Sequence, residues 1–199
     1  MNAIYTRLHG FVTHPARTGW GWLLVRIFVG YQFLAAGLEK LVDGAWIGGN
    51  AGAGLTAFLQ GALSKATGAQ PEVQGWYATL IKQIFLPNAP VFSYLVTFGE
   101  ILVGLALIFG VLSKFSAFWG SVMNLAFLLA GTSANNPQMV VLEVAMILGG
   151  TGVGYYGVDY YLLPLLRKLL QIDAHPAGPP APVGRPQSRG PFPTARPVH

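Results

Sequence analysis

The chain has 199 residues, of which 53% are hydrophobic and only 10% are charged. Soluble domains carry about 25% charged residues, so this composition excludes an ordinary soluble domain and indicates a membrane protein. The net charge of +5 is scattered without a basic stripe, so nucleic-acid binding is not expected. Because the chain has no cysteine, disulfides, a thiolate metal site and a CxxC redox couple are excluded.

Four apolar stretches are long enough to cross a bilayer, which takes about 20 residues. They cover residues 20–38, 90–109, 113–131 and 137–163. We therefore expect an all-α membrane protein, with a four-transmembrane-helix bundle over residues 20–166. It follows an N-terminal cytoplasmic segment of residues 1–19. A proline-rich tail over residues 167–199 cannot bury a core and is expected to be disordered.

The connection between the first two stretches spans residues 39–89 and contains two amphipathic runs, at 55–63 and 75–86. We expect both to form short interfacial helices in the first extracytoplasmic loop. Lysine and arginine residues are more numerous on the side that holds both termini. The positive-inside rule therefore places both termini in the cytoplasm. Asn135 and Asn136 precede the last stretch and are expected to cap it through their side chains; the alternative is that they line an outer vestibule.

Each stretch carries a polar side chain among small residues on one helical face. An ionised side chain at the membrane centre costs about 2.5 kcal/mol or more, so these faces should turn inward. The four faces are Arg26, Gly30, Phe33, Gly37 and Lys40; Ser93, Thr97, Glu100 and Gly104; Ser113, Gly120, Asn124 and Gly131; and Glu143, Met146, Gly150, Gly154 and Gly157.

The depths of these residues, at a rise of about 1.5 Å per residue, predict an ion pair between Arg26 and Glu100. For Glu143 the partners at its own depth are Lys40 or Asn124. Such buried charges have two interpretations: they fix the register of the helices, or they form a functional site. Desolvated ion pairs contribute little net stability, so both interpretations stay open.

The second stretch and the hairpin after it carry the most specific motif, residues 97–107 (TFGEILVGLAL) followed by residues 110–114 (GVLSK). Together with RxxxG at 26–30, GLEK at 37–40, LE at 142–143 and GVD at 157–159, this motif resembles the DoxX/DoxD family of small four-helix membrane proteins. That family includes the membrane part of thiosulfate:quinone oxidoreductase. The resemblance covers about residues 20–165 and implies a bacterial inner-membrane protein. It also implies electron transfer from a small sulfur compound to quinone, or a role as the membrane subunit of a redox complex.

The sequence restricts the redox groups that this chain can hold. A haem between the helices is not expected, because all four histidines lie outside the expected spans, at positions 9, 14, 175 and 199. Fe–S ligation is excluded without cysteine, and no GxGxxG follows a predicted strand, so a flavin or nicotinamide has no binding motif here. Any redox role must therefore use diffusible quinone, a cofactor of a partner, or both.

Quinone reduction consumes protons, so buried carboxyl groups are candidate donors. Our first hypothesis is a quinone-linked oxidoreductase with Arg26, Glu100 and Glu143 as catalytic residues. The residues expected to line its quinone site are Lys40, Asn124, Phe33 and Phe98, with Trp119 as a further ring.

The alternative is a non-catalytic accessory subunit of a larger respiratory or redox complex, and a third hypothesis is a carrier of small solutes or protons. The expected partners are the lipid bilayer and other membrane or redox subunits, with a homo-oligomer left open. No metal site is expected.

Overall fold

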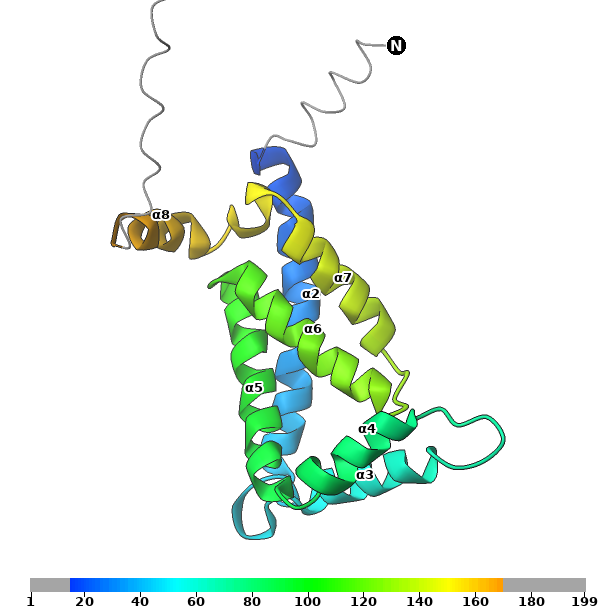
Figure 1. The fold of residues 1–199 in the computed structure, drawn as a ribbon. Helices are drawn as coiled ribbons and strands as arrows, with labels where there is room; N and C mark the ends of the chain where they lie inside the picture. Colours follow the sequence, from blue (N-terminus) through cyan, green and yellow to red (C-terminus); the bar gives the residue numbers. More distant parts are fainter. Residues whose placement is uncertain (1–14, 170–199) are drawn as a thin grey trace, which may run out of the picture.

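The computed structural model describes residues 15–169, and every regular element in that range is helical (Figure 1). The predicted disordered tail begins at residue 167, and its part beyond Leu169 lies outside the described residues, as does most of segment 1–19. Short 3₁₀ turns cover Gly48–Asn50 and Thr151–Gly154, and a π turn covers Ile81–Phe85. The α-helices are α2 (Pro15–Val42), α3 (Ala53–Ser64), α4 (Gly75–Leu80), α5 (Ala89–Phe109), α6 (Ser113–Leu129), α7 (Asn136–Leu148) and α8 (Asp159–Leu169).

Two helices, α2 over Thr18–Val42 and α5, are long and apolar enough to cross a membrane. Ionisable side chains lie buried among apolar ones inside the bundle, whereas many large apolar side chains are exposed on its outer face. Arg26 is 1% exposed and Glu143 is fully buried, whereas Leu24 on α2 is 68% exposed and Leu102 on α5 is 66% exposed. Such a distribution is typical of helices that contact lipid and keep ionisable groups among themselves.

The helices α2 and α5 lie side by side in opposite directions and approach closely at glycines (Figure 1). A Cβ atom added to Gly104 would lie 2.6 Å from the backbone nitrogen of Leu34 and 2.8 Å from the carbonyl oxygen of Gly30. Small residues permit this approach between membrane helices. The contact fixes the register of the two helices and thereby decides which polar residues meet.

The last predicted span is not one helix, and the prediction of a continuous stretch over 137–163 is wrong. Helix α7 ends at Leu148, the 3₁₀ turn follows, and α8 continues in another direction, away from the bundle (Figure 1). Glycine is the weakest helix former after proline, and glycines occupy positions 149, 150, 152, 154 and 157. Asn136 does not cap α7 either, because its Nδ2 donates to the carbonyl of Thr132 and Asn135 makes no side-chain cap bond.

The helices α3 and α4 lie across the end of the bundle opposite α8 (Figure 1). Their buried faces share a hydrophobic cluster with Ala89 of α5 and Ala130 after α6. The hydroxyl of Tyr77 donates to the carbonyl of Ala126 at 2.8 Å and ties α4 to α6. Burial raises the pKa of this phenol, so it remains a donor at any physiological pH. The first loop thus closes one end of the bundle.

Candidate functional site: a polar pocket at the loop end of the bundle

An ion pair between Lys40 and Glu100 forms the centre of the site. Lys40 Nζ lies 2.8 Å from Oε2 and 3.0 Å from Oε1 of Glu100, so the ammonium donates to both carboxylate oxygens. The carboxylate is buried, and the lysine side chain is 16% exposed. The register set by Gly30 and Gly104 brings them together, because Gly37, one turn before Lys40, packs against Glu100 and Ile101.

A second polar pair joins α6 to α7. Asn124 Nδ2 donates to Glu143 Oε1 at 2.8 Å, and both side chains are buried. Asn124 is one of the two partners that the sequence predicts for Glu143. Gly120 provides the space for this carboxylate, since a Cβ there would lie 3.0 Å from Glu143 Oε1. The other oxygen of Glu143, Oε2, has no hydrogen-bond partner among the described residues.

Both pairs border one pocket of about 290 Å³, which we call the polar pocket. Lys40, Glu100 and Asn124 line it, and Asn124 connects it to Glu143. Aromatic rings form much of the remaining wall, and the lysine ammonium lies 5.1 Å from the ring centre of Trp46 and 5.9 Å from that of Phe127. A cation over ring faces and a carboxylate in one cavity can orient a polar, flat molecule. The other lining residues are Gln32, Phe33, Ala36, Phe58, Thr132, Ala134, Asn136 and Met139.

Arg26 is not part of this pocket, and the predicted Arg26–Glu100 ion pair is wrong. Its guanidinium donates to the carbonyl oxygens of Val153, at 3.1 Å, and Tyr156, at 2.8 Å. Fourteen residues separate Arg26 from Lys40 on α2, which is about 21 Å along a helix. The arginine therefore holds the broken last segment against α2.

Asp159 is a buried acidic residue that the stripe of polar residues did not reveal. Its two carboxylate oxygens accept hydrogen bonds from the backbone N–H groups of Leu112 and Ser113. These groups begin α6, where a negative charge is favoured. Leu112 has a φ of 47°, a left-handed conformation that this carboxylate helps to hold. The signal in the sequence is the aspartate of the GVD motif at 157–159.

The predicted ring-binding aromatics separate into inner and outer positions. Phe33 is 2% exposed and lines the polar pocket. Phe98 is 45% exposed on the outer face of α5, stacked on Tyr94 at a centroid distance of 6.2 Å. Trp119 is 47% exposed and lines a groove between α5 and α6. Neither Phe98 nor Trp119 borders the polar pocket, whereas Trp46 and Phe127, which the sequence did not single out, both do.

The family of this chain follows from its match to a protein-family model. The DoxX family model matches residues 21–132, which is more than half of the chain. The chain belongs to the DoxX family. No curated protein and no solved structure matches it. The part of this DoxX protein that the family model matches contains Lys40, Glu100 and Asn124, whereas Glu143 lies beyond it. In residues 15–169 of the DoxX chain, no group of three or more His, Cys, Asp or Glu side chains could hold a metal ion.

Proposed function

We propose that this DoxX protein is an integral membrane subunit of a redox system that passes electrons to quinone. The electrons come from a small donor, such as a reduced sulfur compound, or from a partner protein. The observation that carries the proposal is the Lys40–Glu100 ion pair, which lines a pocket with aromatic walls. A second buried carboxyl group, that of Glu143, lies beside this pocket. A quinone site needs the same parts: an apolar slot for the ring and a few polar groups for its carbonyl oxygens.

The polar pocket suits a quinone ring in shape and chemistry. The ammonium of Lys40 can donate to one carbonyl oxygen, and Asn124 lines the same space. Phe33 and Trp46 supply flat apolar walls. A cation that already lies close to the ring site stabilises the negative charge that develops on a quinone oxygen during reduction.

Reduction of a quinone to a quinol takes up two electrons and two protons. Glu143 is suited to supply one of these protons, because it is buried, one of its oxygens is unpartnered, and Asn124 links it to the pocket. The ammonium of Lys40, which lines the pocket, can supply the other, and both groups then take a proton back from solvent. A buried carboxyl group without a cation is held at lower cost as the neutral acid. The electrons enter from outside this chain, since its sequence carries no haem, Fe–S or flavin motif.

The same proposal includes a four-span bundle of α2, α5, α6 and the segment from α7 through the 3₁₀ turn. The start of α2, the α5–α6 hairpin and α8 lie at one end, and α3, α4 and the α6–α7 connection lie at the other (Figure 1). Arg17, Lys114, Arg167 and Lys168 belong to the first end, which the positive-inside rule assigns to the cytoplasm of a bacterial cell. In this arrangement α3 and α4 lie at the extracytoplasmic surface of the membrane, and the polar pocket opens toward that side.

The test is quinone reduction by the purified protein in lipid nanodiscs, with a short-tailed quinone and thiosulfate or another sulfur donor. Glu100→Gln should abolish the decrease in quinone absorbance while leaving the helical circular dichroism unchanged. Glu39→Gln is the matched control, because Glu39 is exposed and precedes Lys40 directly. Full turnover by the Glu100→Gln protein would contradict the proposal.

A non-catalytic accessory subunit is the second candidate, favoured by the lack of any electron-carrying motif in the sequence. In that case the purified chain shows no quinone turnover alone. It then co-purifies with a larger redox complex, whose activity survives the Glu100→Gln substitution.

A further inference from the structure

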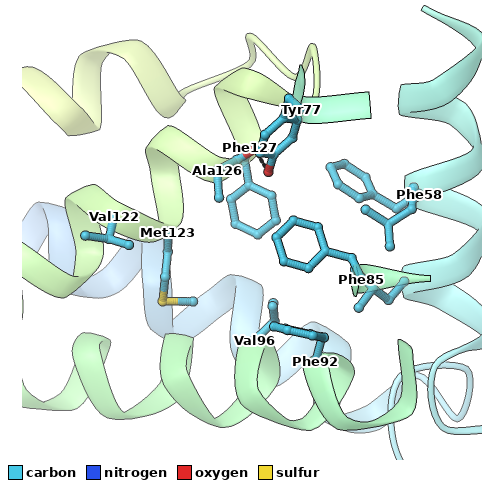
Figure 2. A pocket seen from close by; sticks show the side chains of 11 residues that line it. Phe58, Tyr77, Phe85, Phe92, Val96, Val122, Met123, Ala126 and Phe127 are labelled. Atoms are coloured by element: carbon cyan, nitrogen blue, oxygen red, sulfur yellow. Dashed lines mark hydrogen bonds between the residues drawn. The ribbon is translucent and has the colours of Figure 1, made fainter. Parts of the chain in front are cut away.

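An apolar cavity of about 190 Å³ adjoins the polar pocket, with which it shares lining residues. It lies between α3, α4, the π turn, α5 and α6 (Figure 2). We call it the apolar chamber; Leu55, Phe58, Phe85, Val96, Met123 and Phe127 are among its lining residues. Its one polar side chain is Tyr77, whose hydroxyl is already bonded to the carbonyl of Ala126. The chamber therefore offers no free polar side chain, and its occupant should be hydrocarbon.

Two phenylalanines separate the chamber from the polar pocket. Phe58 and Phe127 line both cavities and contact each other edge to face, with ring centres 5.7 Å apart. The ammonium of Lys40 lies 5.9 Å from the ring centre of Phe127. If a molecule binds with its polar head at Lys40 and Glu100 and its tail in the chamber, these two rings contact the junction between head and tail.

The chamber borders on its other side a groove of about 620 Å³ between α5 and α6. Val96 and Met123 line both spaces, and no charged side chain lines either. Exposed apolar residues border the groove: Leu102 is 66% exposed and Phe115 is 60% exposed. On the span assignment proposed above, the groove opens into the acyl-chain region of the bilayer.

We propose that the apolar chamber holds the isoprenoid tail of the quinone whose ring occupies the polar pocket, and that the quinone enters from lipid through the α5–α6 groove. This inference rests on the proposed function and adds the substrate class, a lipid-tailed quinone. A dry apolar cavity of about 150 Å³ is enough to bind a benzene-sized molecule. The chamber exceeds that size, and the groove extends it.

The experiment maps where each part of a quinone lies, using two photoreactive probes on the protein in nanodiscs. One probe carries an azide on the quinone ring, and the other carries a diazirine in a short isoprenoid tail. We expect the ring probe to label the segments of Lys40 and Trp46 and the tail probe to label those of Phe58 and Phe85. A diazirine phospholipid without a ring should label the outer faces of α2 and α5 instead.

A pair of matched variants tests the chamber itself. Val96→Phe fills the junction of chamber and groove, and Val91→Phe makes the same change at an exposed position of α5 that lines neither space. Because the added ring takes up cavity volume that the tail would otherwise occupy, Val96→Phe should lower tail labelling of Phe58 and Phe85 by about fivefold, and Val91→Phe should leave it unchanged. A thermal melt in nanodiscs checks that both variants fold. In the native chain, an unlabelled tailed quinone should suppress labelling at a lower concentration than a tail-less one, because only the tailed quinone fills the chamber as well as the ring site.

The outcomes separate the two proposals. Ring labelling at Lys40 with tail labelling elsewhere would leave quinone binding intact and overturn the chamber. Equal labelling of the chamber by the ring-less lipid, or labelling that Val96→Phe does not change, would overturn it as well. Absence of specific ring labelling would overturn the proposed function, and the chamber assignment with it.

Discussion

Lys40 and Glu100 form an ion pair, with Nζ 2.8 Å from Oε2, that joins α2 to α5 across 60 positions of sequence. The pair lies where the polar pocket meets the closely packed helix interface. Its two partners therefore have a structural and a chemical role at once. An experiment on either residue must separate the stability of the bundle from the binding of the ring.

We predict that Lys40→Met lowers the free energy of unfolding by about 3 kcal/mol, because it leaves the buried Glu100 carboxylate without a cation. Adding Glu100→Leu should restore most of that loss, since replacement of both partners by apolar groups is often neutral. Unfolding in a detergent titration, followed by circular dichroism, measures both. A Lys40→Met protein as stable as the wild type would show that the pair does not hold α2 to α5.

Glu143→Gln should slow quinone reduction by about a hundredfold without a change in stability. The amide oxygen of glutamine can still accept the hydrogen bond from Asn124 Nδ2, but the side chain can no longer deliver a proton. The rate of quinone reduction at saturating quinone, compared with that of Glu39→Gln, checks this expectation. An unchanged rate would remove Glu143 from the proton path.

Gly104→Ala should destabilise the bundle by about 2 kcal/mol or more, because its Cβ would overlap backbone atoms of α2 that cannot move aside. Gly21→Ala is the control, since nothing lies within 4 Å of a Cβ there. The thermal midpoints of the two variants in the same detergent should differ accordingly. Equal midpoints would mean that α2 and α5 do not pack at this glycine.

Asp159→Ala should cost about 2 kcal/mol, because the N–H groups of Leu112 and Ser113 lose their acceptor while partly or fully buried. Asp43→Ala serves as the control: Asp43 also accepts a backbone N–H bond, from Ala45, but at an exposed site. Faster hydrogen exchange confined to the α5–α6 hairpin would locate the effect. Equal losses for the two variants would contradict the role of Asp159.

The polar character of the site could be predicted from the sequence, but the pairing inside it could not. Polar and charged residues on the small-residue faces of the expected helices should turn inward, and this rule singled out Glu100, Glu143, Asn124 and Lys40. Pairing depends on the register of α2 against α5. The 50 or so residues between these helices leave their register free, and the close contact of Gly30 with Gly104 fixes it only in three dimensions.

The last segment shows a second limit of the sequence. Its apolar stretch is long enough to cross a bilayer, and its glycines are compatible either with close packing of a continuous helix or with a break in the helix. The break prevailed because the freed carbonyls of Val153 and Tyr156 accept hydrogen bonds from Arg26. A buried guanidinium has more donors than one carboxylate can use, and this excess of donors was the overlooked signal.

The early end of α7 has a consequence for the surrounding bilayer. With 13 residues, this helix is about 20 Å long, against a hydrocarbon thickness of about 30 Å. On the span assignment proposed above, the 3₁₀ turn after α7 has to complete the crossing, and lipid beside this flank thins or another polypeptide covers it, whereas the 28-residue α2 imposes no such mismatch. On that assignment the membrane around the protein is uneven in thickness, and the short flank is the one where a neighbouring subunit would relieve the most deformation.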